Sequence, residues 1–175
     1  MEGETKSAPE PVSERTPVFR NIAISGVTIH GAKLAIDVKG LPEMPISGLR
    51  ISDVIASARA GARISYAAME LHNVQMNADQ GPAFLAQDAP DLELDDVGAR
   101  HLAAGMPVIR LDRCPGAIVR NCRALAGTGI FLSVPPGERK SVILEANALG
   151  AAKKPVLEEK MDFDKAARSE ERVIP

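Results

Sequence analysis

Few residues of this chain have types and spacing that could carry chemistry. Its only adjacent aspartates are Asp95 and Asp96. Two carboxyl groups can act as general acid and general base on a glycosidic bond when they stand roughly 6.5–9.5 Å apart around a water molecule. The local pattern favours a structural role instead, because Asp96 falls at a turn position of a sequence repeat and Asp95 at an outward position. We therefore assign no catalytic residue.

The histidines and cysteines do not form a metal-binding pattern either. His30, His72 and His101 are scattered, and two cysteines with three distant histidines lack the spacing of a zinc site. We interpret the histidines as surface residues and predict no metal and no cofactor. Cys122 takes an apolar position of the repeat, so we expect it to be buried. A Cys114–Cys122 disulfide stays open, because geometry decides it.

A short apolar pattern that recurs six times must form the elements that position these residues. Each copy has an apolar residue, one spacer, a second apolar residue, two spacers, and an apolar or small residue. The central residues lie 27, 20, 23, 25 and 25 positions apart, a period typical of solenoid proteins. These central residues are Ile24, Ile51, Leu71, Leu94, Val119 and Leu144.

The spacing of two within each copy predicts a β-strand. The position before the last apolar residue favours a left-handed or turn backbone, and side-chain amides stacked there could form a hydrogen-bonded ladder. Its occupants are Gly26, Asp53, Asn73, Asp96 and Asn121. A turn there would lead to a second strand in each period, with candidates at 35–38, 64–66, 82–86, 108–111 and 130–134.

Two or three strands in about 25 residues predict an all-β, right-handed parallel β-helix of about five to six coils. A leucine-rich repeat is the main alternative, but it would carry one strand per repeat. The composition agrees with the β-helix. The chain is 45% hydrophobic and only 3% aromatic, as expected for a narrow interior filled with stacked aliphatic side chains.

The 175 residues divide into three expected parts: a polar arm at 1–16, β-helix coils at 17–150 and a charged tail at 151–175. Within the tail, residues 157–172 could form a short helix that caps the last coil, and a solvated tail is the alternative. No apolar core follows the start as in a signal peptide, and no apolar run reaches the length of a membrane span. The net charge of −2, without a basic stripe, gives no support for nucleic-acid binding.

The passage TPVFRNIAISGVTIHGAKLAIDVKGLPEMPISGLRISDV, residues 16–54, resembles glycoside hydrolase family 28, the polygalacturonase family. The segments at 31–33 (GAK) and 40–46 (GLPEMPI) carry most of this resemblance, which extends more loosely to about residue 155. The resemblance implies a right-handed parallel β-helix from the C-terminal part of a pectin-degrading hydrolase. Lys33 and Glu43 lie in this passage, and we expect turn and inter-coil contacts for them.

The motifs that carry the family's chemistry are absent from this sequence. The family uses N-T-D, G-D-D, G-H-G and R-x-K motifs upstream of this passage, and none occurs here. We therefore expect this chain alone to be inactive, whereas its parent would hydrolyse α-galacturonosidic linkages with inversion. The alternative is a stand-alone, non-catalytic β-helix that binds carbohydrate or serves a structural role.

The resemblance also predicts partners and location. The implied partners are a pectic polysaccharide, bound through the parent enzyme, and missing N-terminal coils. An uncapped first coil could also support self-association. A polymeric substrate implies a secreted or periplasmic parent, although this chain shows no export signal. The substrate-binding residues cannot be read from the sequence.

Overall fold

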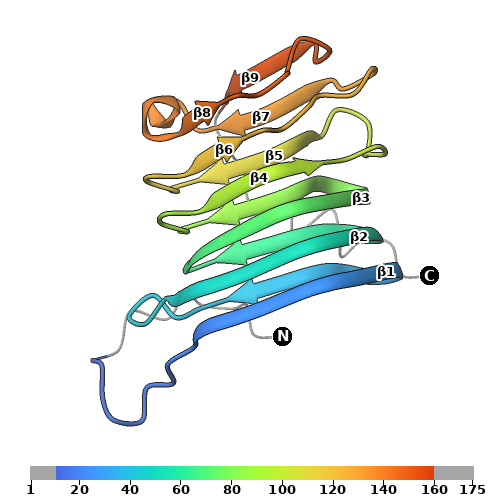
Figure 1. The fold of residues 1–175 in the computed structure, drawn as a ribbon. Helices are drawn as coiled ribbons and strands as arrows, with labels where there is room; N and C mark the ends of the chain where they lie inside the picture. Colours follow the sequence, from blue (N-terminus) through green and yellow to red (C-terminus); the bar gives the residue numbers. More distant parts are fainter. Residues whose placement is uncertain (1–10, 160–175) are drawn as a thin grey trace, which may run out of the picture.

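The computed structural model describes residues 11–159, which form a right-handed parallel β-solenoid of about six coils that rises from β1 to β9 (Figure 1). The β-helix expected from the repeat is therefore confirmed, and the leucine-rich alternative is wrong. The elements are β1 (Arg20–Lys39), β2 (Ile46–Ser65), β3 (Ala67–Gln87), β4 (Glu93–Gly98), β5 (Pro107–Asp112), β6 (Ile118–Arg120), β7 (Ile130–Val134), the 3₁₀ turn η1 (Glu138–Ser141), β8 (Ile143–Glu145) and β9 (Lys154–Glu158).

The strand order shows how each coil divides into two sides. The first part of β3 pairs with β4, while its last residues, 84–87, pair with β5. Above β3 the sheet therefore continues as two stacks, β4–β6–β8 and β5–β7–β9. In β1 and β2 both sides belong to one bent strand of 20 residues. All these pairings are parallel, as stacked coils require.

The register of the sheet coincides with the sequence repeat. The six central apolar residues pair in succession, Ile24 with Ile51, then Leu71, Leu94, Val119 and Leu144. A second inner row lies on the other side of each coil. It consists of Ile36, Ala62, Phe84, Ile109, Leu132 and Val156. Between these two rows lies the single hydrophobic core of the described chain.

Left-handed residues at one corner hold this register. All five predicted turn residues have φ between 51° and 69°. Asp and Asn tolerate this region better than other L-residues, and glycine is unrestricted there. The sixth copy has Ala146 at the same corner with φ 50°, which is a costly conformation for alanine.

The end of the solenoid differs from the expectation. The structure places β9 inside the expected tail, so the coils extend beyond residue 150. Leu157 and Glu158 are strand residues where a helix was expected to begin, and residues 160–175 lie outside the described part. Val156 packs against the core opposite Leu132, but Pro155 and Leu157 beside it break the period-two apolar alternation, and Lys154 and Glu158 are charged. At the other end, residues 11–19 contain no strand.

Candidate functional site

Charged side chains gather on the outer surface of the stack formed by β2, β3, β4 and β6. Alternation along each strand turns Leu71 and Leu94 inward and their neighbours outward. The register places Arg50, Glu70 and Glu93 in one outward row, and His72, Asp95 and Arg120 in the next. We call these six residues the polar face.

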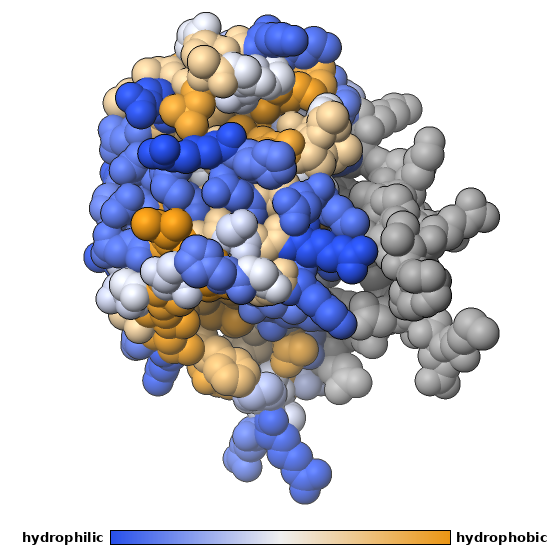
Figure 2. Space-filling model, turned by 90° about the vertical axis from the view of Figure 1, so that its right-hand side faces the viewer, coloured by the Kyte–Doolittle hydropathy of each residue, from blue (hydrophilic) through white to orange (hydrophobic). Residues whose placement is uncertain are grey.

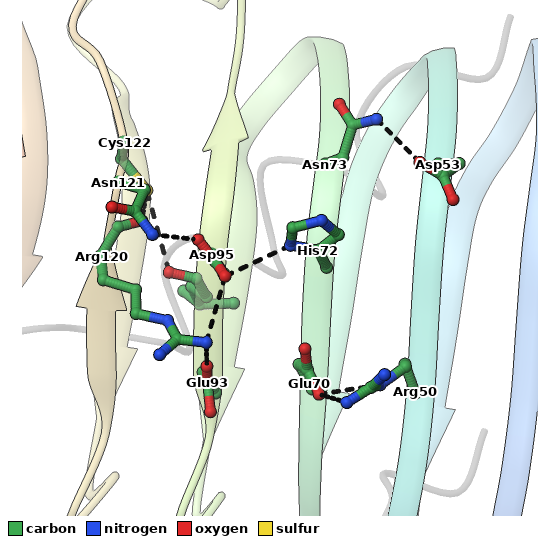
Figure 3. Close-up of polar contacts among 11 residues, drawn as sticks. Arg50, Asp53, Glu70, His72, Asn73, Glu93, Asp95, Arg120, Asn121 and Cys122 are labelled. Carbon is green, nitrogen blue, oxygen red and sulfur yellow. Dashed lines mark hydrogen bonds and ion pairs between the residues drawn. The ribbon is translucent and has the colours of Figure 1, made fainter.

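Ion pairs link the coils across the polar face (Figure 3). Arg50 contacts Glu70 Oε2 through Nη2 at 2.7 Å and through Nε at 2.9 Å. His72 Nδ1 lies 3.3 Å from Asp95 Oδ2, and Arg120 Nη2 lies 3.1 Å from the same oxygen. Arg120 also pairs with Glu93. Each contact joins two stacked strands, so the polar face ties the coils together from outside.

Asp95 is the centre of this network. Its side chain is 10% exposed, and it receives a hydrogen bond on Oδ1 from Asn121 Nδ2 at 2.7 Å. Burial acts to raise the pKa of Asp95, but the hydrogen bond from Asn121, the charge of Arg120 and the contact with His72 outweigh it. The pKa of Asp95 therefore lies below its usual value, and this carboxyl is ionised at neutral pH.

The expected amide ladder forms only in part. Asn73 donates from Nδ2 to Asp53 Oδ1 at 2.8 Å, and this hydrogen bond lowers the pKa of Asp53. Asn121, however, bonds to Asp95 rather than to Asp96, its expected neighbour in the stack.

The basic groups of the polar face stand further out than the acidic groups. The exposed fraction is 64% for the Arg50 side chain and 23% for Glu70. His72 is 48% exposed above Asp95, and Arg120 is 38% exposed above Glu93 at 26%. Among these six residues, three acidic and three basic, solvent therefore meets hydrogen-bond donors first.

The structure separates the two aspartates singled out in the sequence. Asp95 lies on the outer surface beneath Arg120 and Asn121, whereas Asp96 occupies the corner with φ 51°. The outward position of Asp95 and the turn position of Asp96 are both confirmed. Asp95 is nevertheless almost fully buried, because the long side chain of Arg120 covers it.

The three histidines lie apart from one another. His72 belongs to the polar face, while His30 sits in β1 opposite Ser57 and is exposed. His101 follows β4 in a loop, 3.8 Å from Asp79 Oδ1. All three are exposed, as expected for surface residues.

The remaining sequence candidates lie away from the polar face. Lys33 is an exposed residue of β1, and Glu43 lies in the bend between β1 and β2. Cys114 and Cys122 are both free and buried, so no disulfide joins them. Burial raises the pKa of each thiol to about 11, which keeps both protonated and unreactive.

Two findings concern metals and membranes. Between residues 11 and 159 no group of three or more His, Cys, Asp or Glu side chains is arranged to hold a metal ion. Within the same residues, no helix is long and apolar enough to cross a membrane.

A second polar cluster at another corner was not foreseen. Arg113 has φ 51° and reaches Asp88 Oδ1 at 2.6 Å and Asp112 Oδ2 at 2.7 Å. Its backbone N–H donates to Glu138 Oε2 at 2.8 Å. Tyr66 and Asp88 stand at the same corner with φ of 50° and 52°. The sequence has a polar residue at this corner in three successive coils, Tyr66, Asp88 and Arg113, but an arginine or tyrosine at a left-handed corner does not stand out.

Comparison with known proteins gives no relative for this chain. No protein-family model, no curated protein and no solved structure matches it. The function therefore has to be argued from the fold and the polar face.

Proposed function

We propose that this chain is a non-catalytic part of a β-solenoid protein that acts on acidic, pectin-type polysaccharide, and that the polar face holds the polymer. The passage at 16–54 that resembles polygalacturonases suggests this class of substrate. The observation that carries the proposal is the outermost position of the basic groups, with Arg50, His72 and Arg120 above their acidic partners. A stand-alone carbohydrate-binding module would use the same surface.

The chemistry of the donors suits a polyuronate. Arginine presents a planar fork of N–H groups that binds carboxylates with two parallel hydrogen bonds. Arg50 holds Glu70 through Nε and Nη2 and is 64% exposed, which leaves Nη1 for a sugar carboxylate. In Arg120, Nη2 serves both Glu93 and Asp95 and Nε is buried, so Nη1 is the group left for a ligand. A sugar carboxylate can therefore approach from solvent without displacing the existing pairs.

The spacing suits an extended chain. Arg50 is on β2 and Arg120 on β6, three strand steps apart along the stack. At about 4.8 Å per step, the backbones of Arg50 and Arg120 lie roughly 14 Å apart along the solenoid axis, and the two side chains lean toward each other, to Glu70 on β3 and Glu93 on β4. His72 lies between them, and with Nδ1 facing Asp95 its Nε2 is left for a hydrogen bond with a sugar hydroxyl group. The polar face thus forms a row of polar groups along the solenoid axis that an extended chain can follow.

The same geometry argues against hydrolysis at the polar face. A glycosidase needs one carboxylic acid with a raised pKa that gives its proton to the leaving oxygen. Asp95 has a lowered pKa, and both Asp95 and Glu93 are ion-paired with Arg120. Asp95 is therefore not available as a proton donor at neutral pH, and we propose binding without bond cleavage.

Two polymers that differ only in charge test the substrate class. De-esterified polygalacturonate and fully methyl-esterified pectin are titrated into the 175-residue chain by calorimetry. The proposal expects binding to polygalacturonate alone, weakening as salt rises from 50 to 500 mM as screening predicts (about 14 Å to 4 Å of Debye length). Equal binding to both polymers, or to neither, contradicts it.

A parallel assay of reducing-end release tests the absence of catalysis. We expect no release from polygalacturonate above the buffer rate. Turnover that is lost in Asp95→Asn or Asp96→Asn would show that the chain is a hydrolase and would overturn the non-catalytic assignment.

A further inference from the structure

His72 stands in the middle of the polar face and is its histidine, the residue type that ordinarily gains or loses a proton between pH 5 and 8. Its strand β3 lies between β2, which carries Arg50, and β4, which carries Asp95. The His72 side chain is 48% exposed, so solvent and a bound polymer can both reach it. A change in the charge of His72 therefore takes place inside the proposed binding surface.

Asp95 determines which nitrogen of the neutral imidazole holds the proton. Nδ1 of His72 lies 3.3 Å from Asp95 Oδ2, and the lowered pKa of Asp95 keeps this carboxyl ionised at neutral pH. An ionised carboxylate only accepts hydrogen bonds, so the proton of the neutral ring belongs on Nδ1. The other nitrogen, Nε2, is then an acceptor, and it becomes a donor only when the ring takes up a second proton.

The protonation of His72 decides whether it can bind a carboxylate of the ligand. A sugar carboxylate only accepts hydrogen bonds, so neutral His72 has no donor to offer it, whereas protonated His72 offers the N–H at Nε2. A sugar hydroxyl group both donates and accepts, so it can bond to Nε2 in either state. Protonation therefore favours an acidic polymer over a neutral one.

The charge balance of the polar face changes in the same direction. Arg50 and Arg120 stand against three carboxylates, so the six residues carry a net charge of −1 while His72 is neutral and zero once it is protonated. The hydrogen bond from Asn73 and, more weakly, the charge of His72 lower the pKa of Asp53 at the adjoining corner. The charged groups on the strands around His72 are Arg50 and Asp53 on β2, Glu70 on β3, Glu93, Asp95 and Asp96 on β4, and Arg120 on β6.

We propose that His72 makes the polar face pH-responsive, so that the chain holds a polyuronate more tightly at about pH 5.5 than at pH 8. Protonation supplies both the donor at Nε2 and the charge that balances the three carboxylates. The sugar carboxylates stay largely ionised at this pH, because ordinary carboxyl groups have pKa values of about 4. This inference rests on the proposed polysaccharide binding and adds its regulation.

Calorimetric titration of polygalacturonate at about pH 5.5 and pH 8, at one ionic strength, tests the inference. Wild type should bind about three- to fivefold more tightly at the lower pH, which is the effect of one exposed charge contact. His72→Gln removes the titrating group, and its affinity should differ by less than about twofold between the two pH values. His101→Gln is the matched control and should keep the wild-type response, because His101 is exposed and 3.8 Å from Asp79 but lies outside the polar face.

Proton uptake by the unaltered protein gives an answer that does not depend on a variant folding. Titrations of wild type at about pH 6.5, in buffers with different ionisation enthalpies, measure the protons that binding takes up. Because linkage between two ligands is reciprocal, a polymer that binds the protonated form must increase the protonation of His72. We therefore expect uptake of protons by wild type and by His101→Gln, and none by His72→Gln.

Self-association is controlled in the same samples. Hydrophobic residues gather at the lower end of the molecule in Figure 2, where Figure 1 places β1, and Ile22 and Ile24 are 38% and 45% exposed there. Association through these residues would change the apparent affinity for the polymer. Sedimentation velocity at both pH values therefore establishes that the same species is titrated.

The outcomes separate this inference from the function on which it rests. Equal wild-type affinity at both pH values, binding without proton uptake, or an unchanged pH response in His72→Gln overturns the role of His72 and leaves polysaccharide binding standing. Loss of the response in His101→Gln also overturns it. Absence of binding at both pH values overturns the proposed polysaccharide binding and this inference with it.

Discussion

Asn121 Nδ2 donates a hydrogen bond to Asp95 Oδ1 at 2.7 Å, and this bond crosses from one coil of the solenoid to the next. Asn121 holds a left-handed corner with φ 54°, so a single residue turns the chain and also satisfies a buried carboxylate on the polar face. Corner geometry and surface electrostatics are thus coupled at this point of the stack.

Asp95→Ala should lower the free energy of unfolding by about 1–3 kcal/mol at pH 7, because Asn121 and Arg120 lose their shared, nearly buried acceptor. The folded-state pKa of Asp95 lies below its unfolded value of about 3.9. Its contribution is therefore complete above about pH 4 and is lost as the pH falls through the folded pKa. Urea unfolding of both proteins at pH 7 and pH 3 measures the difference.

Asp79→Ala is the control for that experiment. Asp79 is 69% exposed, and its contact with His101 is long at 3.8 Å. Its removal should change stability by less than about 0.5 kcal/mol. A loss for Asp95→Ala that is the same at both pH values would show that the ionised carboxylate is not responsible.

Ala146→Gly should stabilise the protein by about 0.5–1 kcal/mol. Ala146 has φ 50° at the corner where earlier copies of the repeat have Gly, Asp or Asn. Glycine removes a strain of about 1–2 kcal/mol but loses part of this gain to the entropy of the unfolded chain. Thermal unfolding should show a higher Tm. An unchanged or lower Tm would mean that the corner holds no strain at Ala146.

The fold could be predicted because the local sequence contains both the apolar repeat and the residues that form its corners. Period-two apolar spacing, with Gly, Asp or Asn at the corner of five of the six copies, specifies strand, turn and register without long-range information. The end of the solenoid could not be predicted, since β9 has one apolar residue in the inner row, Val156, and its neighbours Pro155 and Leu157 do not continue the period-two pattern. In β9 the contact of Val156 with Leu132 in the previous coil determines the strand, and the local sequence pattern does not.

The polar face was only partly visible in the sequence. The repeat places Ser52, His72, Asp95 and Arg120 at one outward position, but it does not say which side chains reach each other. Arg50 and Glu70 are paired only because β2 and β3 align in register. Asp95 is buried by side chains from the two neighbouring coils, and the spacing of residues in the sequence does not reveal this burial.

Both cysteines should react slowly in the folded protein. Their thiols are buried and have pKa values raised to about 11, so the thiolate fraction at pH 8 is about one in a thousand. We expect Ellman's reagent to label neither Cys114 nor Cys122 within minutes at pH 8, and to label both at once in 8 M urea at about the rate of free thiols. Rapid labelling of the native protein would contradict the buried positions.

Titration of polygalacturonate into wild type and into the double variant Arg50→Gln/Arg120→Gln tests the central claim most directly. Arg59→Gln, an exposed arginine of β2 outside the polar face, is the matched control, and unfolding curves confirm that each variant is folded. We predict that the double variant binds at least about tenfold more weakly, with the control within about twofold of wild type. Equal affinity of the double variant and wild type would contradict the role of the polar face.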